Sequence, residues 1–119
     1  MLDEKFISGV VEALLTAIDN QDWDSLAKLF SDDAVYEVTG FPLYEGRKAI
    51  MNYYENIRPI QSGTHTIESI YQNDKAAVCC GNFKGIKTNG EGIELRFADE
   101  LEFENFKIKN RRVYFCQSD

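Results

Sequence analysis

Cysteine, histidine and proline are all scarce in this sequence, whose 119 residues include three cysteines, one histidine and two prolines. The cysteines lie at positions 79, 80 and 116, a spacing that predicts neither a disulfide framework nor a metal site. The chain also begins without the basic start and long apolar stretch of a signal peptide. Free thiols in such a chain indicate a reducing compartment, so we expect a cytoplasmic protein that binds no metal or other cofactor.

Long apolar runs and an excess of basic residues are missing as well. No run approaches the roughly 20 apolar residues that span a bilayer. The chain has 13 lysines and arginines against 20 acidic residues, a formal net charge of −7. That charge gives no general attraction to nucleic acid backbones or anionic lipid. We therefore expect neither nucleic acid nor a membrane as a partner.

What the sequence does contain is typical of a folded domain. Hydrophobic residues make up 44% of the chain and aromatic residues 13%, which argues against disorder. The length fits one domain that spans residues 1–119.

The order of the expected elements predicts an α+β fold. Apolar residues at helical spacing indicate helices over residues 3–19, 22–30 and 47–57, with a strand at 34–38. Four further strands, separated by turn residues, are expected at 64–72, 75–86, 91–104 and 106–116. Such an order predicts helices that cover one face of an antiparallel sheet.

Asp99 is the most unusual residue of these strands. In the alternating segment 93–103 it shares one face with large apolar side chains, among them Phe97 and Leu101. Burial disfavours a charged carboxylate and raises its pKa, which makes Asp99 a candidate for acid–base chemistry. The alternative is a structural acid that is paired with an arginine or a backbone N–H.

Tight turns would bring several polar residues to the same inner face. A two-residue turn at Asn89-Gly90 would place Asp99 opposite Cys80, with Asn82 on the same face. The only histidine, His65, is expected there too, either for proton transfer or as a satisfied core residue. On a flat sheet, His65 and Asp99 would be roughly 12 Å apart, which suits a ligand between them better than a hydrogen bond.

Two adjacent arginines decide between the alternatives for Asp99. A tight turn at Asn105-Phe106 would set Arg112 opposite Asp99, while a β-bulge would turn Arg111 inward instead. Either arginine would favour the ionised carboxylate, and Asp99 would then be structural or bind a ligand.

The outer face of the expected sheet has a small and partly apolar centre. This centre would consist of Ala77, Cys79, Gly81, Phe83 and Ala98. Because homodimers dominate among oligomers, we expect a second copy of the chain to cover it.

Several segments together resemble the nuclear transport factor 2-like superfamily, in its SnoaL-like and ketosteroid-isomerase-like branch. The resemblance covers nearly the whole chain and implies a cone-shaped α+β barrel, with three N-terminal helices on a strongly curved, mainly antiparallel sheet. It also implies a pocket between helices and sheet, and a dimer formed through the sheet. The segments that carry it are Asp22-Trp23 through Tyr36, Tyr44 through Ile50, Phe97 through Phe103, and Val113-Tyr114-Phe115.

The resemblance also implies roles for individual residues. Ketosteroid isomerases combine a base with an oxyanion hole made of a Tyr and a protonated Asp. The Asp of that site matches Asp99, but the Tyr position falls at Leu14 and the base position at Val38. The steroid isomerase mechanism is therefore not expected. The resemblance to SnoaL-like cyclases, which use a carboxylate on this part of the sheet to move a proton next to a carbonyl, implies chemistry that needs fewer fixed residues, and Asp99 matches that carboxylate.

We thus expect a pocket for a small apolar or carbonyl-bearing molecule, and an isomerase, cyclase or dehydratase that uses no cofactor. Asp99 would move the proton, while His65 or a tyrosine hydroxyl would orient the substrate. The alternative is a non-catalytic ligand-binding or dimerisation module of the same fold. Expected pocket residues are Leu14, Tyr36, Val38, Tyr54, Cys80, Asn82, Phe97 and Arg112.

Overall fold

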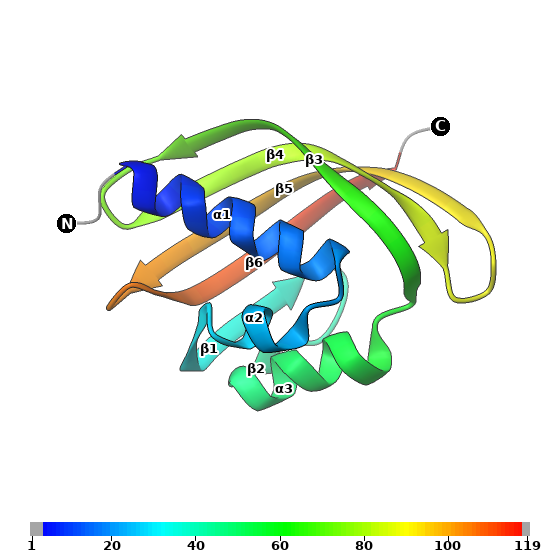
Figure 1. Ribbon diagram of the computed structural model, residues 1–119, viewed down its shortest axis with the longest axis horizontal. Coiled ribbons are helices and arrows are strands. Elements are labelled where there is room, and N and C mark those ends of the chain that lie inside the picture. The colour runs from blue at the N-terminus through cyan, green and yellow to red at the C-terminus, as the bar shows by residue number, and fades with distance from the viewer. Residues whose placement is uncertain (1–3, 118–119) are drawn as a thin grey trace.

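A six-stranded sheet curls around one long helix in the computed structural model, which describes residues 4–117. Figure 1 shows α1 crossing one face of the sheet, with α2 and α3 beside the short strands β1 and β2. The elements are α1 Glu4–Asp19, α2 Trp23–Ala27, β1 Phe30–Val38, β2 Tyr44–Glu45, α3 Arg47–Asn52, a π-helical turn η1 Tyr53–Ile57, β3 Ile60–Gln72, β4 Ala76–Lys87, β5 Gly92–Glu104 and β6 Lys107–Gln117.

The sheet has the strand order β2-β1-β6-β5-β4-β3, and every pair is antiparallel except the parallel pair β1–β6. It curls without closing into a full barrel. The expected α+β architecture, with three helices on a curved and mainly antiparallel sheet, is confirmed.

The core lies between α1 and the concave face of the sheet. Ile7, Val11, Leu14 and Ile18 recur at three or four residues along α1 and are at most 1% exposed. This spacing gives the helix one apolar stripe that faces the sheet.

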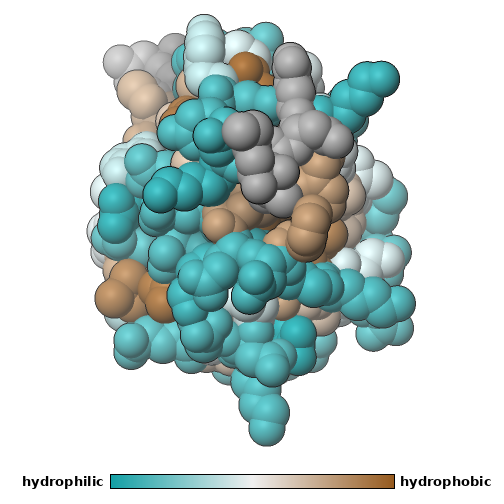
Figure 2. All heavy atoms as spheres, turned by 90° about the vertical axis from the view of Figure 1, so that its left-hand side faces the viewer, coloured by the Kyte–Doolittle hydropathy of each residue, from teal (hydrophilic) through white to brown (hydrophobic). Residues whose placement is uncertain are grey.

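None of the helices in the described part of the chain has the length and apolar character needed to cross a bilayer. Figure 2 shows the end of the molecule near the start of α1, where polar side chains cover most of the surface.

The second helix is shorter than its sequence pattern predicts. It ends at Ala27, and Phe30 is already the first residue of β1. Phe30 pairs with Ile108 on β6, whose N–H donates to the carbonyl of Leu29 at 2.8 Å. The prediction of a helix over 22–30 is wrong because sheet pairing buries Phe30 completely. Position 3, the expected start of the first helix, lies outside the described residues.

The loop between β4 and β5 has three residues, not the two that we expected. Ile86 pairs with Gly92, and the N–H of Lys87 donates to the carbonyl of Glu91, so residues 88–90 form the loop. Gly90 has a φ of 92°, as such a loop requires at its last position. One extra residue shifts the register by one and moves every β4 side chain to the opposite face.

This shift overturns the expected composition of the outer face. Ala77, Cys79 and Phe83 point into the core and are at most 3% exposed. Polar neighbours such as Asn82 and Arg96, which pair across β4 and β5, lie outside instead. Of the expected centre, Ala98 stays on the outer face, where it pairs with Cys80 and Tyr114. The expected composition is therefore wrong for Ala77, Cys79 and Phe83, and a second copy on this face stays a prediction.

Candidate functional site

A cavity of about 540 Å³ lies between the concave face of the sheet and the segment 53–60. Its volume is within the range of small-molecule pockets, roughly 300 to 1,000 Å³. Most of its wall is aromatic or aliphatic, and the few charged side chains on it are Asp99, Arg111, Arg58 and Lys87.

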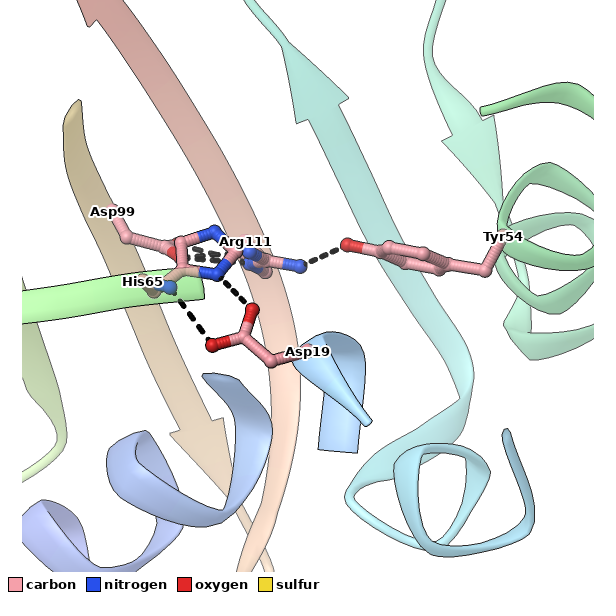
Figure 3. Close-up of polar contacts among 5 residues, drawn as sticks. All are labelled: Asp19, Tyr54, His65, Asp99 and Arg111. Atoms are coloured by element: carbon pink, nitrogen blue, oxygen red, sulfur yellow. Dashed lines mark hydrogen bonds and ion pairs between the residues drawn. The ribbon is translucent and has the colours of Figure 1, made fainter. Parts of the chain in front are cut away.

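Arg111 and Asp99 form a buried ion pair in the depth of this cavity (Figure 3). Arg111 Nε donates to Oδ1 of Asp99 at 2.9 Å, and Nη2 donates to Oδ2 at 2.7 Å. The third nitrogen, Nη1, donates to the hydroxyl of Tyr54 at 2.5 Å. The guanidinium also lies 4.7 Å from the centre of the Tyr36 ring, in the range of a cation–π contact. Asp99 is 1% exposed and Arg111 4%.

These contacts fix the charge of the groups around Arg111. Burial works against the charged guanidinium, but Asp99, Tyr54 and Tyr36 outweigh it and hold the pKa of Arg111 well above its usual value. Burial raises the pKa of Tyr36 well above its usual value, and it raises that of Tyr53 to about 12. Near neutral pH, the cavity therefore holds a permanent cation beside neutral phenol groups.

A bulge in the last hairpin selects Arg111 over Arg112. The turn at Asn105-Phe106 is tight, but the register shifts between Glu102 and Phe103. Arg112 consequently lies on the outer face, where it donates to Glu37 at 2.9 Å and to Glu100 at 3.3 Å. The assignment of Arg112 to the pocket is wrong, and Asp99 is not the isolated acid that its strand predicts.

Three more of the expected pocket residues lie elsewhere. Cys80 and Asn82 are on the outer face, since the longer β4–β5 loop shifts the register by one residue. Cys79 takes the inner position opposite Asp99, and burial together with Asp99 raises the pKa of its thiol to about 12. Leu14 is fully buried in the core, and Ile18, one turn later on α1, lines the cavity instead.

Tyr36, Val38, Tyr54 and Phe97 do lie on the cavity wall. Whether they contact a substrate stays a prediction. The sequence reasoning missed Tyr44 and Tyr53, which pack together at 4.7 Å between ring centres and also line the cavity. The sequence feature that could have indicated them is the group of three tyrosines at positions 44, 53 and 54. All three line the cavity once α3 packs against β1.

His65 also lines the cavity and is held by Asp19, the last residue of α1 (Figure 3). Asp19 Oδ1 lies 2.6 Å from His65 Nδ1, and Oδ2 accepts from the His65 backbone N–H at 2.8 Å. Because a carboxylate only accepts, Nδ1 carries a proton, and in the neutral imidazole Nε2 is the nitrogen with the lone pair. Among residues 4–117, no group hydrogen-bonds to Nε2. Phe83 and Phe97 fix the imidazole plane, at 4.6 and 5.3 Å between ring centres.

Asp19 was not predicted as a site residue. In the sequence it is the only acid in the last turn of the first helix, and only the folded chain brings it to β3. Within residues 4–117, no group of three His, Cys, Asp or Glu side chains is arranged to hold a metal ion.

The chain belongs to the family of SnoaL-like domains, whose family model matches residues 11–111. A comparison with curated proteins returned no match. Among solved structures, it is similar to an LEH-like epoxide hydrolase of M. tuberculosis, with 23% identity, a TM-score of 0.79, and coverage of 90% of this chain and 80% of the other.

Two further structures are similar over almost their whole length. One is SalBIII, an epoxide hydrolase/cyclase-like enzyme with a role in pyran ring formation in the polyether salinomycin, with 19% identity, a TM-score of 0.83, and coverage of 98% and 95%. The other is an NTF2-like protein from Burkholderia pseudomallei K96243, with 13% identity, a TM-score of 0.85, and coverage of 93% and 91%. At these identities the likeness establishes the fold alone.

Proposed function

We propose that the cavity binds an apolar molecule with a carbonyl or comparable oxygen, and that the protein transfers a proton on it. The reaction would be an isomerisation, cyclisation or dehydration that uses no cofactor. One observation carries this proposal: an imidazole oriented by a carboxylate and a charge-compensated guanidinium line the same apolar cavity.

His65 is the group that moves the proton in this proposal. Its free Nε2 accepts a proton from a carbon next to the carbonyl, and Asp19 stabilises the imidazolium that forms. The role that the strand pattern suggested for Asp99 thus passes to His65, because Asp99 is fully engaged with Arg111.

Arg111 stabilises the negative charge that develops on the substrate oxygen. A guanidinium has five N–H groups, and the contacts to Asp99 and Tyr54 leave one on each Nη atom for a ligand. Preorganised donors of this kind act strongly where water is excluded. Asp99 is a positioning residue in this scheme, since it holds the guanidinium in place.

The names of two similar structures support this class of chemistry. One is named as an epoxide hydrolase, and the other as an epoxide hydrolase/cyclase-like enzyme with a role in pyran ring formation. The scaffold is therefore suited to such reactions, while the site residues must carry the argument for this chain.

Hydrogen–deuterium exchange tests the proposal without knowledge of the natural substrate. We expect the protein to accelerate exchange of the protons next to the carbonyl of 1-tetralone in D2O, followed by proton NMR. His65→Gln should lower the catalysed rate by about 10²-fold or more, and Asp19→Asn should lower it less. The matched control is Lys84→Gln, which alters an exposed side chain outside the cavity. Equal rates for wild type and His65→Gln would refute the role of His65.

A non-catalytic ligand-binding protein is the second candidate. The ion pair of Asp99 and Arg111 favours it, because an Asp99 that is engaged with Arg111 has a structural role and need not take part in a reaction. In that case 1-tetralone would bind, as a chemical-shift titration would detect, and its exchange rate would equal the rate in buffer.

A further inference from the structure

The cations at the entrance of the cavity point to the charge of its ligand. The whole chain carries a net charge of −7, yet three cations and one carboxylate line the cavity. Arg111 and Asp99 compensate each other in its depth. Arg58 and Lys87 are left, and both are half-buried.

These two cations come from neighbouring segments. Ile60, two residues after Arg58, pairs with Lys87 at the end of β4, and the N–H of Thr88 donates to the carbonyl of Pro59 at 3.2 Å. Exposed apolar residues of the same wall, Phe41 and Ile57, are 61% and 51% exposed. This end is therefore the mouth, while Asp99 and Arg111 mark the depth.

Within residues 4–117, Arg58 has no carboxylate partner and Lys87 has only a long and exposed one. The guanidinium of Arg58 lies over the rings of Tyr54 and Phe83, at 5.7 Å from each centre, and makes no ion pair within residues 4–117. Lys87 is 3.9 Å from Glu91, whose side chain is 69% exposed. A pair of that length and exposure contributes little, so both cations can still accept an anion.

We infer that the natural ligand is an apolar carboxylic acid, whose carboxylate binds Arg58 and Lys87 at the mouth. Its apolar body lies along Phe83, Ile93, Leu95 and Phe97, which line the cavity between the two ends. The oxygen on which the reaction takes place then lies near Arg111. The inference rests on the proposed function for this last point only, because the anion site at the mouth is independent of any chemistry.

The test compares an acid with its neutral amide. The probes are 1-naphthylacetic acid and 1-naphthylacetamide, whose dissociation constants are measured by calorimetry. We expect the acid to bind about tenfold more tightly, since two partly desolvated cations face its carboxylate. This preference should decrease as the salt concentration rises.

Variants of Arg58 and Lys87 test whether these two residues cause the preference for the acid over the amide. Arg58→Gln with Lys87→Gln should lower the affinity for the acid to that for the amide, with a much smaller change for the amide. Arg58→Lys should keep most of the preference, and Lys84→Gln, on the same strand outside the cavity, should keep all of it.

Equal affinities of acid and amide for the wild type would overturn the inference, as would no binding of either probe. An equal loss for both compounds in the double variant would overturn it as well. If tetralone exchange depends on His65 but the acid is not preferred, the proposed function stands and this inference fails. If the acid is preferred through Arg58 and Lys87 but no exchange is catalysed, the anion site stands and the proposed function fails.

Discussion

A carboxylate and a guanidinium that are buried together stabilise a fold only as a pair. Asp99 and Arg111 are both nearly inaccessible to water, and each is the main partner of the other. Removal of one member leaves an uncompensated charge in the interior, which costs more than the pair contributes. The strand pattern around Asp99 was enough to find the buried acid. It could not identify the partner, because Arg111 and Arg112 are adjacent and a single bulge decides which one points inward.

Asp99→Asn should lower the free energy of unfolding by about 3 kcal/mol or more, because Arg111 would lose its counter-ion. Urea denaturation measures this change. Glu100→Gln, an adjacent outward-facing acid, should stay within about 0.5 kcal/mol of the wild type. The double variant Asp99→Leu with Arg111→Met should recover most of the lost stability. An Asp99→Asn protein as stable as the wild type would contradict the ion-pair account.

The three thiols should differ strongly in reactivity. Burial and the nearby Asp99 raise the pKa of Cys79 to about 12, so at pH 8 almost none of it is the reactive thiolate. Cys116 is exposed. We expect Cys116 to react first with a disulfide reagent such as DTNB, and Cys79 to react only on unfolding. Three rapid equivalents in the native protein would show that Cys79 is accessible.

At the scale of elements, the sequence predicted five of the six strands, all but β2, and did not predict how they align. Periodicity shows that β4 alternates, yet the face of Cys80 and Asn82 depends on whether the following loop has two or three residues. Asn89-Gly90 is compatible with both lengths, and the difference of one residue reverses the faces. The end of α2 was misplaced for a related reason, because Phe30 gains its burial from a strand almost 80 residues away.

Gly81 is the glycine on which the β3–β4 pairing depends most. A Cβ atom there would lie 2.0 Å from the carbonyl oxygen of Thr66 and 3.1 Å from the ring of Phe97. Gly81→Ala should therefore destabilise the fold by about 1–3 kcal/mol, measured as a lower midpoint of thermal unfolding. Gly92→Ala is the matched control, since a Cβ at Gly92 meets nothing within 4 Å. Equal midpoints for the two variants would mean that the strands are less closely paired at Gly81.

At the scale of the whole molecule, the family resemblance predicted the cavity but not which residues meet on its wall. Family resemblance places a pocket between helices and sheet. Its pair of Asp19 and His65 comes from α1 and β3, its ion pair from β5 and β6, and its tyrosines from β1, β2 and η1. Periodicity within one segment cannot predict neighbours that are distant in the sequence, which is why Asp19 was missed and the choice between Arg111 and Arg112 as partner of Asp99 stayed open.

The tyrosines of the cavity should make the whole fold sensitive to alkaline pH. Burial raises the pKa of Tyr53 to about 12 and raises that of Tyr36 well above its usual value, so the folded state retains phenol protons that the unfolded chain loses near pH 10. The unfolded state then binds fewer protons, and the free energy of unfolding falls as the pH rises from about 10 to 12. Urea titrations at several pH values measure this slope, which Tyr53→Phe should reduce. A flat profile in this range would contradict the burial of these hydroxyl groups.

Nitrogen-15 NMR of the imidazole tests the proposed role of His65 most directly, because the chain has a single histidine and its signals need no assignment among others. We expect a proton on Nδ1, held by Asp19, and an unprotonated Nε2 in the resting protein. Addition of 1-tetralone should shift the Nε2 signal in a saturable way and leave Nδ1 bonded to Asp19. A proton on Nε2 with Nδ1 free, or an Nε2 signal indifferent to the ketone, would contradict the claim that His65 is presented to the ligand.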